Sequence, residues 1–122
     1  MNIMTADSHK IAVRYLRKQK QKDEAVILAH GFSTHKDMFL FQEMSAMFHR
    51  FYDVLTFDFR GHGESGGLFS WTSHEARDLH AVISFAEKQG YKKVGLIGFS
   101  LGAAATLIEA GQNPNSIIKS IR

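Results

Sequence analysis

The stretch GFSLG, residues 98–102, places one serine between two glycines and is the candidate centre of chemistry in this 122-residue chain. An apolar run leads directly into it, and an alanine-rich segment that is typical of a helix follows. This order predicts a very tight strand-to-helix turn with Ser100 at its apex, in a strained backbone conformation that costs about 1–3 kcal/mol. Gly98 and Gly102 lack the β-carbons that would collide in such a turn. We therefore expect Ser100 to be a nucleophile, presented above the edge of a sheet at the N-terminus of a helix.

A serine hydroxyl also needs a histidine to take its proton and a carboxylate to orient that histidine. The chain has seven histidines, and all of them precede Ser100. Glu109 is the one carboxylate after Ser100, and we expect it to lie along the helix that leads away from the site, where it cannot orient a base. His30 and His62 follow two predicted strands and are conceivable substitute bases at the same edge of the sheet.

The elements that must position this serine alternate between strand and helix. Apolar patterning predicts strands over residues 9–17, 25–31, 52–59 and 92–98, and the opening of a further strand at 116–122. Helical periodicity predicts helices over 37–50 and 101–110, and one between a capping box at Thr72 and Glu75 and a C-terminal cap at Gly90. This alternation predicts an α/β fold with a parallel sheet and helices on both faces, a three-layer α/β/α domain.

Two of the predicted helices carry apolar stripes that we assign to the core. The first stripe consists of Leu40, Met44, Met47, Phe48 and Phe51, and the second of Ala76, Leu79, Val82, Ile83 and Ala86.

Composition indicates a single globular domain, with 44% apolar and 22% charged residues and a net charge of +3. Much of the positive excess lies in RKQKQK, residues 17–22, which we interpret as a solvated turn and not as a nucleic-acid-binding segment, because no aromatic residues interleave. The lack of cysteine excludes disulfides and thiolate catalysis. We expect a cytoplasmic protein, since the start of the chain lacks a signal-peptide pattern and no apolar run reaches membrane-spanning length.

Three motifs, in this order along the chain, resemble those of the α/β-hydrolase superfamily, and most closely its serine aminopeptidase-like and lysophospholipase-like branch. HGFSTHKDMF (residues 30–39) resembles the His-Gly loop that follows the third strand of that fold. FDFRGHGES (57–65) resembles the D-x-R-G-x-G-x-S segment after the fourth strand, and GFSLGA (98–103) resembles the nucleophile elbow. The resemblance covers about residues 9–122 and implies that residues 1–122 form the N-terminal part of a single α/β-hydrolase domain, truncated after the elbow helix.

The resemblance also implies a role for each matched position. Ser100 would be the catalytic nucleophile, and the backbone N–H groups of Phe32 and Leu101 would form the oxyanion hole and so contact the substrate. The acid and the histidine of the triad would come from sequence after Arg122. Structural roles are implied for His30, Gly31, Asp58, Arg60, Gly61, Gly63, Gly98 and Gly102, whereas Leu68, Phe69 and Trp71 either line a substrate pocket or pack under the following helix.

These expectations describe a serine hydrolase that transfers the acyl group of a small-molecule ester, thioester or amide to water, with no metal and no organic cofactor. The chain by itself is expected to show little or no catalysis, and its exposed sheet edge favours self-association. An alternative is a non-catalytic α/β-hydrolase remnant or binding scaffold.

Two other classes of protein are disfavoured. GHGESG (61–66) matches the dinucleotide-binding pattern G-x-G-x-x-G, but five residues intervene before the capping box, and Glu64 would repel a pyrophosphate. His74 and Glu75 begin like a zinc-binding H-E-x-x-H motif, but the next histidine is His80, on a different face of the helix.

Overall fold

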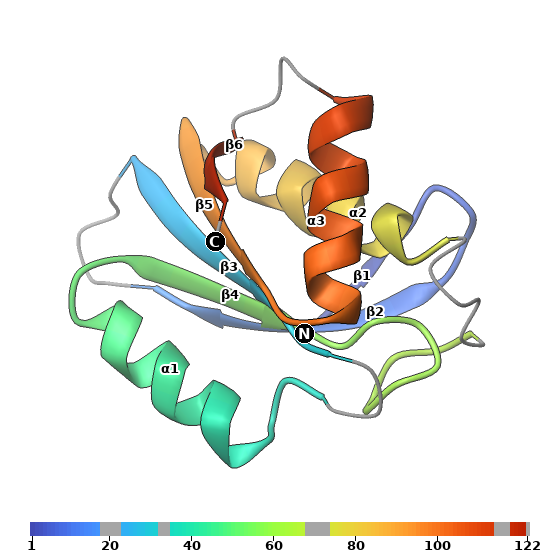
Figure 1. Cartoon of the computed structure of the whole chain (residues 1–122), viewed down its shortest axis with the longest axis horizontal. Helices are drawn as coiled ribbons and strands as arrows, with labels where there is room; N and C mark the ends of the chain where they lie inside the picture. The colour runs from blue at the N-terminus through green and yellow to red at the C-terminus, as the bar shows by residue number, and fades with distance from the viewer. Residues whose placement is uncertain (18–22, 32–34, 68–73, 114–117, 122) are drawn as a thin grey trace.

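A computed structural model describes residues 1–17, 23–31, 35–67, 74–113 and 118–121, and shows a six-stranded sheet between two layers of helices (Figure 1). The strands lie in the order β1-β2-β4-β3-β5-β6. Their bounds are β1 Asn2–Met4, β2 Lys10–Leu16, β3 Glu24–Ala29, β4 Asp53–Phe57, β5 Lys93–Gly98 and β6 Ile118–Ile121. One face of the sheet is covered by α1 (Phe39–His49), and the other by α2 (Glu75–Lys88) and α3 (Leu101–Gln112) (Figure 1).

The predicted α/β/α layering is confirmed, but the sheet is mixed and not parallel throughout. β1 pairs antiparallel with β2, and β2 pairs antiparallel with β4, whereas β4, β3, β5 and β6 run parallel. For β1 and β2 the reason is the length of the connection, since parallel neighbours need a crossover of a dozen or more residues. Only residues 5–9 join β1 to β2. The sequence analysis did not predict β1.

The core consists of two apolar clusters, one on each face of the sheet. Ala25, Ile27 and Ala29 of β3 belong to the larger cluster, together with residues of α2 and α3, while Val26 and Leu28 belong to the smaller one with Phe41 of α1. This alternation explains why β3 reads as a continuous apolar run, because both of its faces are covered. The second predicted stripe lies in the larger cluster: Leu79, Val82, Ile83 and Ala86 are almost fully buried, and Ala76 is buried beside them.

The first predicted stripe is wrong in part. Leu40, Met47 and Phe51 are exposed by 57%, 57% and 64%, although their spacing predicts a place in the core. Met44 and Phe48 pack partly against the smaller cluster, beside the buried Phe41 and Ser45. In the described chain α1 lies alone on its face of the sheet (Figure 1), so only one side of this helix is covered.

The predicted C-terminal cap of α2 is found in the structure, whereas its predicted N-terminal capping box is not described. α2 begins at Glu75 with His74 as its N-cap, without a side-chain cap, and the predicted capping residue Thr72 lies outside the described residues. At the other end, Gly90 has φ of 100° just beyond the last turn, as expected for a C-terminal cap. Tyr91 donates its backbone N–H to the Ala86 carbonyl at 3.2 Å, which closes the helix.

The strand register brings three connections to one edge of the sheet. Ala29, the last residue of β3, pairs with Phe57 of β4 and with Gly98 of β5. The chain therefore leaves the three central strands at the same level, and the segments that begin at residues 30, 58 and 99 lie side by side. Ligands of open α/β sheets bind at this edge, beyond the carboxyl ends of the strands.

Candidate active site

Ser100 lies at the apex of a tight strand-to-helix turn. β5 ends at Gly98 and α3 begins at Leu101, the same bounds that the sequence predicts, so two residues separate strand and helix. Ser100 has φ of 51° and ψ of −108°, and it is exposed. A positive φ at a residue with a side chain is strained by about 1–3 kcal/mol and persists only when the surrounding structure enforces it.

Two glycines allow the backbone contacts that enforce this turn. A β-carbon on Gly102 would lie 2.2 Å from the carbonyl oxygen of Ala29 and 2.8 Å from that of His30. A β-carbon on Gly98 would lie 2.5 Å from the carbonyl carbon of Gly102. The first turn of α3 therefore packs directly on the backbone at the end of β3, at a distance that only glycine permits.

The segment after β3 lies against the turn. A β-carbon on the buried Gly31 would be 3.3 Å from the Phe99 carbonyl oxygen and 3.5 Å from the Ser100 β-carbon. Leu101 is the first residue of α3, so its backbone N–H has no acceptor within the helix. The other predicted oxyanion donor, Phe32, lies outside the described residues.

His30 connects this segment to the end of β4. Its Nε2 accepts a hydrogen bond from the Phe59 backbone N–H at 2.9 Å, so Nδ1 carries the proton and donates to the Gly31 carbonyl at 2.7 Å. The ring is fully buried, and burial lowers the pKa of His30 from 6.5 to about 4. A neutral imidazole with both nitrogens bonded to the backbone holds the loop in place and is unsuited to act as a base for Ser100.

The Asp58 carboxylate holds together the loops that follow β3 and β4. It accepts the backbone N–H groups of Lys36 at 2.7 Å and Glu64 at 2.9 Å, and the Lys36 ammonium at 3.1 Å. Burial opposes the charge of Lys36, but hydrogen bonds to Glu64, Asp37 and Asp58 outweigh it and raise the pKa of that ammonium group.

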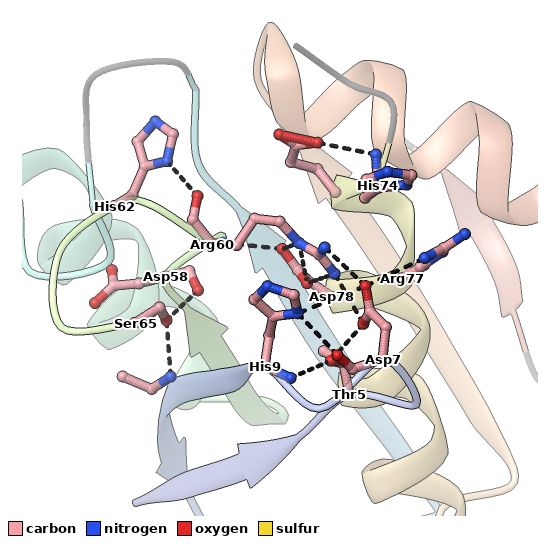
Figure 2. Close-up of polar contacts among 12 residues, drawn as sticks. Thr5, Asp7, His9, Asp58, Arg60, His62, Ser65, His74, Arg77 and Asp78 are labelled. Atoms are coloured by element: carbon pink, nitrogen blue, oxygen red, sulfur yellow. Dashed lines mark hydrogen bonds and ion pairs between the residues drawn. The ribbon is translucent and has the colours of Figure 1, made fainter. Parts of the chain in front are cut away.

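Gly63 and Ser65 complete this turn. A β-carbon on Gly63, which has φ of 49°, would lie 2.3 Å from Asp58 Oδ2. The Ser65 hydroxyl donates to the Asp58 carbonyl at 2.5 Å and accepts the Ala12 backbone N–H at 2.9 Å (Figure 2). The segment that matched a dinucleotide-binding pattern thus forms a compact turn on the strand β2.

The Arg60 guanidinium lies between two carboxylates from distant parts of the chain (Figure 2). It is 2% exposed and donates to Asp78 of α2 at 2.8 Å and to Asp7, from the β1–β2 turn, at 2.8 Å. Hydrogen bonds from Arg60 hold the pKa of Asp7 far below its ordinary range, and Thr5 and Arg77 contribute in the same direction. This network anchors the β1–β2 turn and the start of α2 to the segment that follows β4. Gly61, with φ of 72°, continues the chain from it.

The remaining candidate base, His62, and the candidate acid, Glu109, have other hydrogen-bond partners than Ser100. His62 is 8% exposed, and its Nδ1 contacts the Arg60 carbonyl at 3.0 Å. Glu109 lies on the helix that leads away from the site, as expected, and its carboxylate contacts the Nδ1 of His80 at 2.7 Å and not an imidazole beside Ser100. That pair lies near the far end of α3 from Ser100. Within the described residues, no hydrogen bond joins Ser100 to an imidazole.

Two further observations concern other kinds of site. Nowhere in the described ranges do three or more His, Cys, Asp or Glu side chains gather as a metal site would require. Of the helices that the structure describes, none combines the length and the apolar character needed to cross a membrane.

Comparison with known proteins gives a consistent result. Residues 26–120 match the model of the alpha/beta hydrolase family. The chain is 35% identical over 97 residues to ethanol acetyltransferase 1 of Wickerhamomyces ciferrii, a match that covers 77% of this chain and 23% of that protein. It is 28% identical over 107 residues to putative esterase/lipase 3 of Mycoplasma pneumoniae, a match that covers 85% of this chain and 37% of that protein.

Solved structures agree with these relatives. An esterase from Pyrococcus furiosus superposes with a TM-score of 0.85 at 28% identity, covering 99% of this chain and 46% of the esterase. A Butyrivibrio proteoclasticus protein with bound ferulic acid shares the fold, with a TM-score of 0.86 at 21% identity, and is covered to 50%. The chain thus spans half or less of the length of each of these proteins.

The contact of Gly102 with Ala29 gives a testable expectation. Gly102→Ala should lower the free energy of unfolding by roughly 3 kcal/mol or more, because the added methyl overlaps backbone atoms that cannot move aside. Gly111→Ala, in the same helix, is the matched control, since nothing lies within 4 Å of the position its methyl would take. It should stabilise by at most about 1 kcal/mol through helix propensity. Urea unfolding measures both variants, and equal stabilities would contradict the packing described here.

The lowered pKa of His30 gives an expected pH dependence. Between pH 6.5 and about 4 the unfolded chain binds a proton that the folded chain excludes, so stability should fall as the pH falls through this window. The loss should reach at most about 3 kcal/mol. His30→Gln keeps one acceptor and one donor without titrating. Urea midpoints of the two proteins should therefore converge on acidification, and parallel curves would rule out a buried neutral imidazole.

Proposed function

The chain belongs to the alpha/beta hydrolase family, and from this premise we propose that it carries the nucleophile of a serine hydrolase that acts on small-molecule esters, thioesters or amides. The geometry of Ser100 supports this proposal most directly. Ser100 is exposed on a strained turn at the positive end of α3, next to Leu101, the first residue of the helix. Esterases among the similar structures favour the same reaction class.

The proposed reaction has two steps. Ser100 Oγ attacks the carbonyl carbon of the substrate while a histidine takes its proton, and the negative charge that develops on the carbonyl oxygen is stabilised by the backbone N–H groups of Leu101 and Phe32. The leaving alcohol, thiol or amine takes the proton from the histidine. Water then attacks the acyl-serine, the acid is released, and Ser100 regains its proton. This chemistry requires neither a metal nor an organic cofactor.

The acid and the base of this reaction are proposed to lie outside these 122 residues. In the family the acid and the histidine follow the nucleophile in sequence. After Ser100 the chain has neither Asp nor His, and Glu109 is engaged with His80 at a distance from the site. The chain on its own should therefore turn over substrate slowly or not at all, and a non-catalytic scaffold is the alternative that activity measurements would reveal.

An alcohol in place of water is a second candidate acceptor. It is favoured by the 35% identity to a protein named ethanol acetyltransferase 1. Both reactions pass through the same acyl-serine, so Ser100 and the oxyanion donors have the same roles. Product analysis in the presence of ethanol separates them, because transfer gives an ethyl ester and hydrolysis gives a free acid. We retain the cytoplasm as the proposed location of the reaction.

The role of Ser100 is tested by covalent labelling. A fluorophosphonate should react with Ser100, and Ser100→Ala should remove the labelling together with any ester turnover. Ser84→Ala is the control, since Ser84 is partly buried on α2 and should not affect the reaction. Peptide mass spectrometry identifies the modified residue. Labelling that survives in Ser100→Ala would refute the assignment of the nucleophile.

We also propose that the chain self-associates. Phe39, Leu40, Met47 and Phe51 expose apolar surface on and beside α1, and β1 and β6 are the outermost strands of the described sheet. Sedimentation velocity should show larger species as concentration rises, and Phe51→Gln should weaken the association more than Met4→Gln on the opposite side of the sheet. A monomer with a sharp, concentration-independent melting transition would contradict this proposal.

A further inference from the structure

A groove of about 670 Å³ runs along α2, between β1 and the C-terminal end of α3. Its floor is a stripe of α2 side chains at helical spacing, which includes Arg77, Ala81, Phe85 and Lys88. The volume lies within the range of small-molecule sites, roughly 300–1,000 Å³. Ser100 lies at the other end of α3, so the groove is distinct from the candidate active site.

The middle of the groove is apolar. Ala81 and Ser84 are small and leave space above the helix, while Ile3 of β1 and Phe85 pack partly against the larger core cluster and keep one side on the groove. Met4, which is 61% exposed, extends the wall along β1. An alkyl chain that replaced water along this floor would gain about 25 cal/mol for each Å² of apolar surface buried.

The opposite wall is held by an ion pair or strong hydrogen bond. His80 Nδ1 lies 2.7 Å from Glu109 Oε1, and the Glu109 side chain is 2% exposed whereas that of His80 is 50% exposed. Because a carboxylate only accepts hydrogen bonds, Nδ1 carries a proton and the ring is fixed against α3. The wall is thus organised before any ligand binds. Glu109 lines the groove, but its side chain is almost fully buried and its carboxylate accepts a hydrogen bond from His80.

Cationic groups lie at both ends of the groove. Arg77, near the start of α2, contacts Asp7 at 3.2 Å, so its charge is already balanced. Lys88, at the end of α2, has no ion pair among the residues that the structure describes, and the amides of Gln112 and Asn113 line the same groove. One unbalanced cation beside polar donors complements a single negative charge, and the apolar floor complements an alkyl chain.

We propose that this groove binds the anion of a fatty acid, with the carboxylate near Lys88 and the alkyl chain along Phe85, Ala81 and Met4. Lys88 follows Arg77 by eleven positions along the helix, which at about 1.5 Å per position gives a floor roughly 16 Å long. This inference does not rest on the proposed function, because no group of the groove takes part in chemistry at Ser100.

The test is calorimetric titration of the whole 122-residue chain with laurate, below the concentration at which laurate forms micelles. We expect one binding site. Ala81→Phe fills the groove and Lys88→Glu reverses its unbalanced charge, and each should weaken binding at least tenfold. Lys92→Glu makes the same charge change outside the groove and should leave binding unchanged, as should Ser100→Ala. Methyl laurate, which lacks the charge, should bind at least tenfold more weakly than laurate.

Several results would overturn the proposal. They are the absence of laurate binding, laurate binding that Ala81→Phe leaves unchanged, and equal affinity for laurate and its methyl ester. Loss of laurate binding in Ser100→Ala would also overturn it, because the ligand would then bind at the candidate active site. Far-ultraviolet circular dichroism establishes that each variant is folded. Because Lys88 is exposed, its substitution tests the charge even where a variant at position 81 fails to fold.

Discussion

The structure around the candidate site depends on one steric constraint, the direct contact of the first turn of α3 with the backbone at the end of β3. Gly102 permits this contact, and the strained conformation of Ser100 follows from it, because strand and helix have only two residues in which to reverse direction. Burial of Leu101 and Ala105 in the core offsets the strain by holding α3 on the sheet. The exposed position of Ser100 is therefore a consequence of packing and is not a local preference of serine.

Polar groups then fix the loops that surround this turn. His30, Asp58 and Arg60 follow the central strands β3 and β4, and each is buried with its hydrogen-bonding groups directed at backbone or at an opposite charge. Buried ion pairs add little net stability, because desolvation consumes most of the Coulombic gain. Their effect here is positional: they hold the loops after β3 and β4 and the β1–β2 turn in fixed relation to the sheet.

The two ends of α3 present different chemistry. The N-terminal end carries Ser100 and the Leu101 N–H, which has no acceptor within the helix, and this suits a group that develops negative charge. The C-terminal end carries Glu109, which fixes the imidazole of His80 and so shapes the groove along α2. A histidine and a carboxylate in contact are the components that the proposed reaction requires at Ser100, but this pair lies about a helix length away from it.

The sequence by itself determined the features that depend on short spacing. Two glycines around Ser100 predicted the tight turn, and apolar runs predicted the central strands, because backbone geometry and burial on both faces constrain residues a few positions apart. Only the tertiary structure decided which side of α1 is covered, which strands run antiparallel, and that Asp7 and Asp78 flank Arg60. The same holds for the pairing of His80 with Glu109, 29 positions apart. Such contacts depend on strand order and on the packing of whole elements, which no local pattern of residue types records.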